Sequence, residues 1–126
     1  MFDWVSVNTS SLTGKALDWS VAYALNGTPL LDKAFPDMKI GDSFLYAVNN
    51  GIIKPTTDWS QCGELIDYEG IEFRWLSDAV VEAYSHTMSE NRARGNDHRE
   101  AACRLIALEL GETVMVPAEL VVQSSR

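Results

Sequence analysis

The segment from residue 97 to residue 110 constrains the fold of this chain more than any other. Asp97 and Glu100 have the spacing of a capping box, in which an aspartate begins a helix and a glutamate three residues later completes the cap. Gly111 stands where a glycine typically ends a helix. The apolar residues between them recur at helical spacing: Ala102, Leu105, Ile106, Leu108 and Leu110. A helix with one apolar stripe must bury that stripe, so the chain must fold around it in layers.

A second helix is predicted over residues 13–26. Thr13 is suited to the N-cap, and Leu12 before it can pack on Leu17 in the arrangement called a hydrophobic staple. Gly27 is expected to end this helix. The apolar stripe consists of Leu17, Val21, Ala24 and Leu25.

A third helix is predicted over residues 58–69. Asp58 and Gln61 repeat the capping-box spacing, and Gly70 follows the last apolar position. The apolar positions at helical spacing are Trp59, Cys62, Leu65 and Ile66.

Segments rich in β-branched and aromatic residues predict the strands. The expected strands are 2–7, 43–48, 52–54, 71–75, 79–84 and 112–116. The pair Asn50-Gly51 favours a hairpin between the second and third of them, because both residues tolerate a positive φ. Residues 28–41 and 85–96 are expected to be loops, and residues 118–122 either a helical turn or an extended tail.

The length and composition allow one core. A chain of 126 residues with 46% hydrophobic residues can bury a single core and has no room for a second one. The fold class predicted from these elements is α+β. We expect a single domain over residues 1–126, in which about three helices pack on an antiparallel sheet.

The charge and the cysteines limit the partners and the location. The net charge of -8 repels a phosphate backbone, so direct nucleic-acid binding is not expected. The longest uncharged stretch, Trp19–Leu31, is shorter than the roughly 20 apolar residues that span a bilayer, so no membrane segment is expected. Cys62 and Cys103 lie far apart without a C-x-x-C motif, which suggests free thiols in a cytoplasmic protein.

Three blocks of the chain resemble a known family. They are LTGKALDWSV at residues 12–21, TDWSQ at 57–61 with ELI at 64–66 and EGI at 69–71, and a block from AACR at 101–104 to VPAEL at 116–120. In this order they are similar to the NinX-type family of small proteins encoded by bacteriophages and prophages. The resemblance implies a phage-encoded accessory protein in the bacterial host cytoplasm, and it supplies no mechanism.

Two segments depart from the family pattern. Residues 62–64 are Cys-Gly-Glu where the family typically has a Gly-Gly-Pro turn. Residues 95–98 are Gly-Asn-Asp-His where it often has Gly-Pro-Thr-Pro. A function that the family places on this second loop would have a different chemistry in this chain.

The segment from 64 to 82 carries most of the excess negative charge. It contains six acids and only Arg74 as a base. The acids are Glu64, Asp67, Glu69, Glu72, Asp78 and Glu82. One interpretation is a solvated face that aids solubility. The other is an acidic binding surface that meets a basic partner and imitates the phosphates of a nucleic acid.

A second stretch has the opposite charge. Four arginines lie between residues 92 and 104: Arg92, Arg94, Arg99 and Arg104. Their planar guanidinium groups could hold a carboxylate or a phosphate of a nucleotide or another small molecule. Alternatively, they are surface charges that pair with the acidic segment.

An Asp-Trp pair occurs twice, as Asp18-Trp19 and as Asp58-Trp59. Asp58 is explained as the N-cap of its helix, and Asp18 could bond an indole N–H or an arginine. Both tryptophans are expected to be structural anchors in the core.

No catalytic or metal-binding motif is found. Cys62, Cys103, His86 and His98 lack the short-range pairing of zinc ligands, so no metal and no cofactor is expected. We therefore predict a non-enzymatic phage protein that binds a basic surface of a host or phage protein, with host takeover or counter-defence as its purpose. The alternatives are a small nuclease or nucleotide hydrolase built on the carboxylates, and a nucleotide-binding or small-molecule-binding module built on the arginines.

Overall fold

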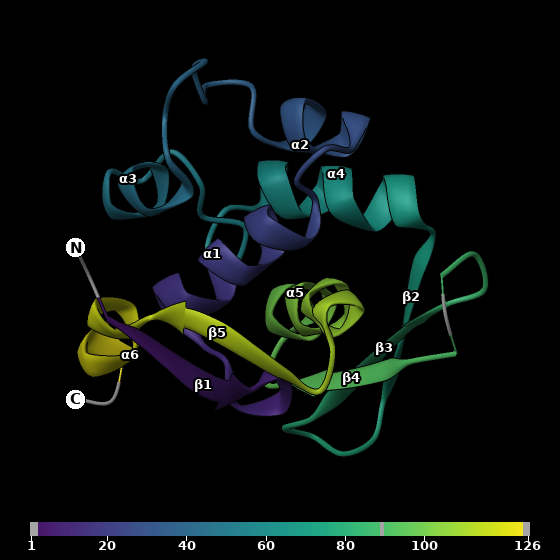
Figure 1. Cartoon of the computed structure of the whole chain (residues 1–126). Helices are drawn as coiled ribbons and strands as arrows, with labels where there is room; N and C mark the ends of the chain where they lie inside the picture. Colours follow the sequence, from purple (N-terminus) through teal and green to yellow (C-terminus); the bar gives the residue numbers. More distant parts are fainter. Residues whose placement is uncertain (1–2, 89, 125–126) are drawn as a thin grey trace.

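The fold is arranged around helix α5 (His98–Ala107), which lies near its centre (Figure 1). The structure is a computed structural model that describes residues 3–88 and 90–124, with the backbone alone for 122–124. The Asp97 carboxylate accepts a hydrogen bond from the Glu100 backbone N–H at 2.8 Å, as the capping box predicts. The residues of α5 that are buried are Ala101, Ala102, Cys103, Leu105, Ile106 and Ala107. The helix is therefore buried over more than one narrow stripe.

The strands form two antiparallel sheets. One has the order β2 (Ile71–Trp75), β3 (Val81–Ser85) and β4 (Arg92–Gly95), and the other pairs β1 (Trp4–Asn8) with β5 (Thr113–Pro117). Helix α5 covers one face of the first sheet, against β3 and β4. The α+β fold class is confirmed, but the strands form two sheets where one was expected. Phe2, the first residue of the first predicted strand, lies outside the described residues.

The other two predicted helices also bury most of their apolar stripes, with Trp59 as the exposed exception. Helix α1 (Gly14–Ala24) packs against both α5 and β5, and helix α4 (Trp59–Glu69) packs on α5 and β2. Leu17, Val21 and Leu65 are fully buried, and Ile66 is partly buried against the same core. Thr13 is the N-cap residue of α1, but its side chain forms no capping hydrogen bond.

The hairpin predicted for residues 43–54 is wrong. Helix α3 (Phe44–Asn49) occupies this region, and the Ser43 hydroxyl caps it by accepting the Tyr46 backbone N–H. Gly51 has a φ of 71°, and the Asn50 side chain donates to the Tyr46 carbonyl. Gly51 therefore ends a helix here. Tolerance of a positive φ suits a helix end and a hairpin turn equally, which is why the sequence favours a hairpin at this position.

Both predicted loops contain regular structure. Helix α2 (Pro29–Ala34) lies within residues 28–41 and begins with a proline, whose fixed φ suits the first turn of a helix. Strand β4 lies within residues 85–96. The short helices η1 (Thr9–Ser11) and η2 (Leu108–Leu110) follow β1 and α5. Helix α6 (Ala118–Ser124) follows β5, so the helical alternative is the one observed for residues 118–122.

The sequence does not predict strand β4, because its buried residues are an alanine and a glycine and give no alternating pattern of large apolar side chains. Ala93 and Gly95 face α5 and are buried, while the intervening arginines are exposed. A Cβ atom on Gly95 would lie 2.5 Å from the backbone N of Ala101, which is closer than real Cβ atoms come. Close contact between β4 and α5 therefore requires glycine at this position.

We predict that Gly95→Ala lowers the free energy of unfolding by roughly 1 to 3 kcal/mol, the range typical of an overpacked core. The matched control is Gly63→Ala, at a helix position where no described atom beyond the chain neighbours and the helix's own backbone lies within 4 Å of the added Cβ. This control should raise the free energy of unfolding by about 0.5 to 1 kcal/mol, because alanine favours a helix over glycine. Urea titrations measure both, and wild-type stability of Gly95→Ala would contradict the close contact.

Candidate binding surfaces

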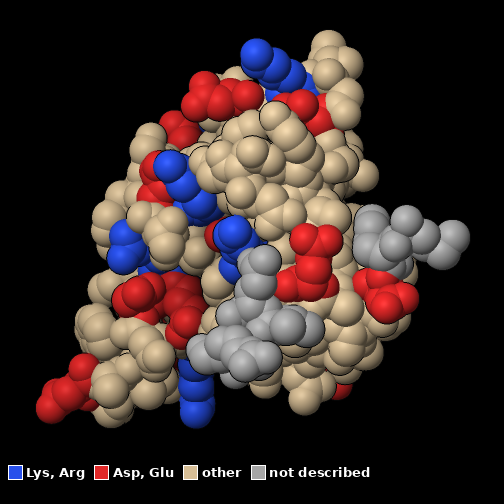
Figure 2. All heavy atoms as spheres, turned by 90° about the vertical axis from the view of Figure 1, so that its left-hand side faces the viewer, with Lys and Arg blue, Asp and Glu red and all other residues tan. Residues whose placement is uncertain are grey.

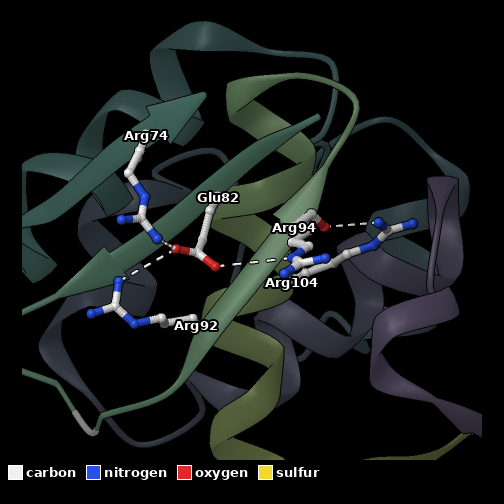
Figure 3. Close-up of polar contacts among 5 residues, drawn as sticks. All are labelled: Arg74, Glu82, Arg92, Arg94 and Arg104. Atoms are coloured by element: carbon white, nitrogen blue, oxygen red, sulfur yellow. Dashed lines mark hydrogen bonds and ion pairs between the residues drawn. The ribbon is translucent and has the colours of Figure 1, made fainter. Parts of the chain in front are cut away.

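The outer face of the three-stranded sheet carries a cluster of arginines around one carboxylate. Arg74 on β2, Glu82 on β3 and Arg94 on β4 lie directly opposite one another in register, and Arg92 lies two residues from Arg94 (Figure 3). Because side chains alternate along a strand, all four project from the face that α5 leaves open. We call these four residues the arginine face.

Glu82 is the buried centre of the arginine face. One of its oxygens lies 2.9 Å from Arg74 and 3.4 Å from Arg92, and the other lies 3.9 Å from Arg94. Its side chain is 7% exposed, whereas those of Arg74, Arg92 and Arg94 are 62%, 54% and 70% exposed. One carboxylate compensates one of three guanidinium charges, so the face has a local positive excess in a chain of net charge -8.

Arg104 joins α5 to strand β4 and to the segment between η1 and α1. Its Nε donates to the Leu12 carbonyl at 2.9 Å, and its Nη1 donates to the Arg94 carbonyl at 2.9 Å (Figure 3). The same Nη1 lies 3.4 Å from the Glu100 carboxylate. Three partners hold this guanidinium in place, and its side chain is only 14% exposed.

A groove of about 600 Å³ opens beside Arg104, between β4 and the end of the β1–β5 sheet. Arg92, Arg94 and Arg104 line it on one side, and Asn8, Ser10 and Glu112 on the other. We call it the seam groove. Of the four arginines that the sequence groups together, three meet here.

The fourth, Arg99, belongs to a separate aromatic cluster. Its Cζ lies 4.9 Å from the centre of a Trp59 ring, and it donates to the Thr57 carbonyl at 3.3 Å. The His98 ring is in contact with Trp59 and, edge-on, with Phe73 and Trp75. Trp59 is 54% exposed, so the prediction that it anchors the core is wrong.

The acidic residues of segment 64–82 are separated by the structure. Glu82 is buried in the arginine face, which removes it from an exposed acidic surface. The remaining five are partly or fully exposed: Glu64, Asp67, Glu69, Glu72 and Asp78. We call these five the acidic surface. Glu72 lies 3.2 Å from the His86 imidazole, whereas Glu64, Asp67 and Asp78 form no ion pair with any residue that the structure describes.

Negative charges crowd at the end of α4. Partial burial raises the pKa of Glu69 above its usual value, and the nearby Glu109 carboxylate raises it further. Tyr68 is 51% exposed next to Glu69, on the same helix face as Glu64. The acidic surface thus includes an exposed aromatic side chain.

Asp18 and Asp58 have structural roles. The Asp58 carboxylate accepts the Gln61 backbone N–H at 3.1 Å, which confirms it as the N-cap of α4. Asp18 is buried, and its two oxygens accept the Thr56 backbone N–H at 2.9 Å and the Thr56 hydroxyl at 3.1 Å. Asp18 therefore ties α1 to the turn before α4 and bonds neither the indole nor the arginine expected from the sequence. Trp19, which is 5% exposed, is the core anchor that was predicted.

The two cysteines lie inside the core. Cys62 on α4 and Cys103 on α5 are both completely buried free thiols. Hydrogen bonding with the Cys62 thiol and burial raise the pKa of Cys103, with smaller contributions from charge on Cys62, Asp18 and Asp97. A buried thiol with a raised pKa is a poor nucleophile. Among the described residues, no three His, Cys, Asp or Glu side chains gather as metal ligands.

Charges of both signs are mixed on one further side of the molecule. Figure 2 shows the side on which α3 and α6 lie, where Lys and Arg side chains alternate with Asp and Glu. Within the described part of the chain, no helix is both long and apolar enough to cross a membrane. The arginine face and the acidic surface are therefore the two places that we consider for charge-based recognition.

The fold and these surfaces define a small α+β protein with two surface regions of opposite charge. A family model described as Bacteriophage P22, NinX matches residues 8–109, which include α1 to α5 and all three strands of the larger sheet. The chain belongs to this family of bacteriophage proteins, and it is a phage accessory protein. No functionally curated protein and no solved structure matches it significantly.

The burial of Asp18 predicts a pH dependence of stability. Burial raises the pKa of Asp18 to about 6 from 3.8, against the lowering effect of both Thr56 hydrogen bonds. Between these values the folded state binds more protons than the unfolded state, so the Asp18 contribution is greatest below pH 4 and is lost as the pH rises through 6. Asp18→Asn should therefore gain roughly 2 to 3 kcal/mol in free energy of unfolding, relative to wild type, between pH 4 and pH 7.

Urea titrations at several pH values measure this difference. Asp78→Asn, at the exposed turn between β2 and β3, controls for the loss of one carboxylate and should follow the wild-type profile. A constant difference between Asp18→Asn and wild type from pH 4 to pH 7 would show that Asp18 is not desolvated as described.

Proposed function

We propose that this phage accessory protein is a non-enzymatic binding protein that uses its acidic surface to hold a basic surface of a host or phage protein. The observation that supports the proposal most is that no base of the acidic segment neutralises the acidic surface. Arg74, the only base in that segment, pairs with the buried Glu82. Glu64, Asp67 and Asp78 are left without an ion pair among the described residues.

The crowding of acids at the end of α4 supports the same role. Partial burial raises the pKa of Glu69, and the nearby Glu109 carboxylate raises it further, so this region carries like charges that repel one another. A basic partner would relieve that repulsion on binding. Tyr68 adds an exposed aromatic side chain to the surface, and tyrosine is enriched among the residues that dominate binding energies.

The electrostatics also suggest what such binding would achieve. A surface with several uncompensated carboxylates attracts proteins whose own surfaces are built to bind phosphates. By occupying the basic surface of a host nucleic-acid-binding or defence protein, the chain would block that protein from its nucleic acid. Host takeover or counter-defence in the bacterial cytoplasm is the purpose that we propose for this binding.

Charge reversal tests the proposal. We predict that the triple variant Glu64→Lys, Asp67→Lys, Asp78→Lys loses the protein partner that the wild type retains from lysate of the phage-infected host, as identified by mass spectrometry. The matched control is Asp3→Lys, Asp37→Lys, Glu90→Lys, which changes the charge by the same amount at exposed positions outside the acidic surface. The control should retain the partner.

The purified partner then allows a kinetic test. The reversed variant should associate at least about ten-fold more slowly than wild type, because steering by charge acts on the association rate. Wild-type association should also slow with added salt, since attraction between exposed charges is screened over about 10 Å at 0.1 M. Equal retention by both variants, or an association rate indifferent to salt, would refute binding through the acidic surface.

A further inference from the structure

We propose that the seam groove is a binding site for a small phosphorylated ligand of mononucleotide size, held through the guanidinium groups of Arg92, Arg94 and Arg104. The site is distinct from the acidic surface and is independent of the function proposed above. It lies where β4 faces the end of the β1–β5 sheet, at a junction that three separate segments of the chain form together.

The residue types favour a phosphate. All three cations of the groove are arginines, although lysines make up four of the ten Lys and Arg residues of the chain. Arginine presents a planar fork of donors that matches the oxygens of a phosphate, whereas lysine acts as a point charge. Glu100 pairs with Arg104, Glu112 lines the other side of the groove, and Glu82 is shared among Arg74, Arg92 and Arg94. Three carboxylates thus face four guanidinium groups, and Arg92 and Arg94 are not fully neutralised.

Arg104 and Arg92 have partners that orient them before any ligand arrives, and Arg94 lies within ion-pair distance of Glu82. Arg104 is fixed through the Leu12 and Arg94 carbonyls, and its Nη2 takes part in none of the contacts that the structure describes for this side chain. Arg92 lies over the Tyr84 ring, with its Cζ 4.9 Å from the ring centre. Both Arg92 and Arg94 form ion pairs with the buried Glu82 (Figure 3). Preorganised donors lose less conformational entropy on binding.

The size and the remaining walls favour a small molecule over a polymer. A volume of about 600 Å³ is in the range of small-molecule sites. Ala93 and Leu108 give the groove apolar surface, while Asn8, Ser10 and Glu112 offer polar groups to the hydroxyls at the far end of a ligand. A nucleic-acid strand would extend beyond the groove and meet a chain with net charge -8.

Isothermal titration calorimetry on the full chain tests the proposal with four probes: adenosine 5′-monophosphate, ribose 5-phosphate, inorganic phosphate and adenosine. We expect saturable binding of at least one of the two phosphate esters and no binding of adenosine. Arg92→Gln and Arg94→Gln should each weaken this binding at least about ten-fold, because each removes a charged donor from the phosphate.

Arg74→Gln is the matched control. Arg74 pairs with the same Glu82 and is as exposed as its neighbours, but it does not line the groove. This variant should bind the phosphate ester as tightly as wild type. Exposed arginines are chosen for all three variants, since Arg104 also holds the fold together and its loss could unfold the chain.

Several results would overturn the proposal. They are the absence of binding by both phosphate esters, equal binding of adenosine, and equal weakening by Arg74→Gln and Arg94→Gln. Two competitors distinguish other anionic ligands. If a tetraglutamate peptide or a single-stranded oligonucleotide displaces the ester at a lower concentration than the ester itself binds, the groove is a site for an acidic polypeptide or a nucleic acid and the proposed ligand class is wrong.

Discussion

The structure depends on the burial of helix α5. Its alanines, together with Gly95 on β4, allow strand and helix backbones to approach closely, and its larger residues Leu105 and Ile106 fill the space toward the other elements. Small residues line the contact, so β4 packs closely against the helix. Because side chains alternate along a strand, the arginines of β4 then lie on the opposite face. The packing of the core thereby determines which side chains are available for recognition.

The packing of the sheet on α5 also determines which charged residues lie next to one another. Glu82 belongs to the acidic segment in sequence, yet its position on the central strand β3 places it between arginines from both neighbouring strands. This pairing concentrates positive charge on the sheet face, and among the described residues the acids of α4 form no ion pair. Two surfaces of opposite charge result from a single strand register.

How far each element could be predicted follows from its length and from its contacts. Helices α1, α4 and α5 are long enough for apolar spacing to identify them, and the caps Asp58 and Asp97 hold as expected. Helix α3 was mistaken for a strand because six residues barely distinguish the two periodicities and the glycine after it suits both a hairpin and a helix end. Of the candidate surfaces, the sequence shows which charged residues cluster along the chain, but the structure separates Glu82 and Arg99 from the groups in which the sequence places them.

By itself, the sequence determined the fold class, three helices, most strands and the family to which the chain belongs, because periodicity, caps and motifs depend on residues that are close together in the sequence. Only the tertiary structure decided which charges meet. Arg104 reaches Leu12 and Arg94, and Asp18 reaches Thr56, across separations that no local pattern encodes. Contacts of this kind depend on how helices and sheets pack, so the seam groove and its arginines emerge only when the chain is folded.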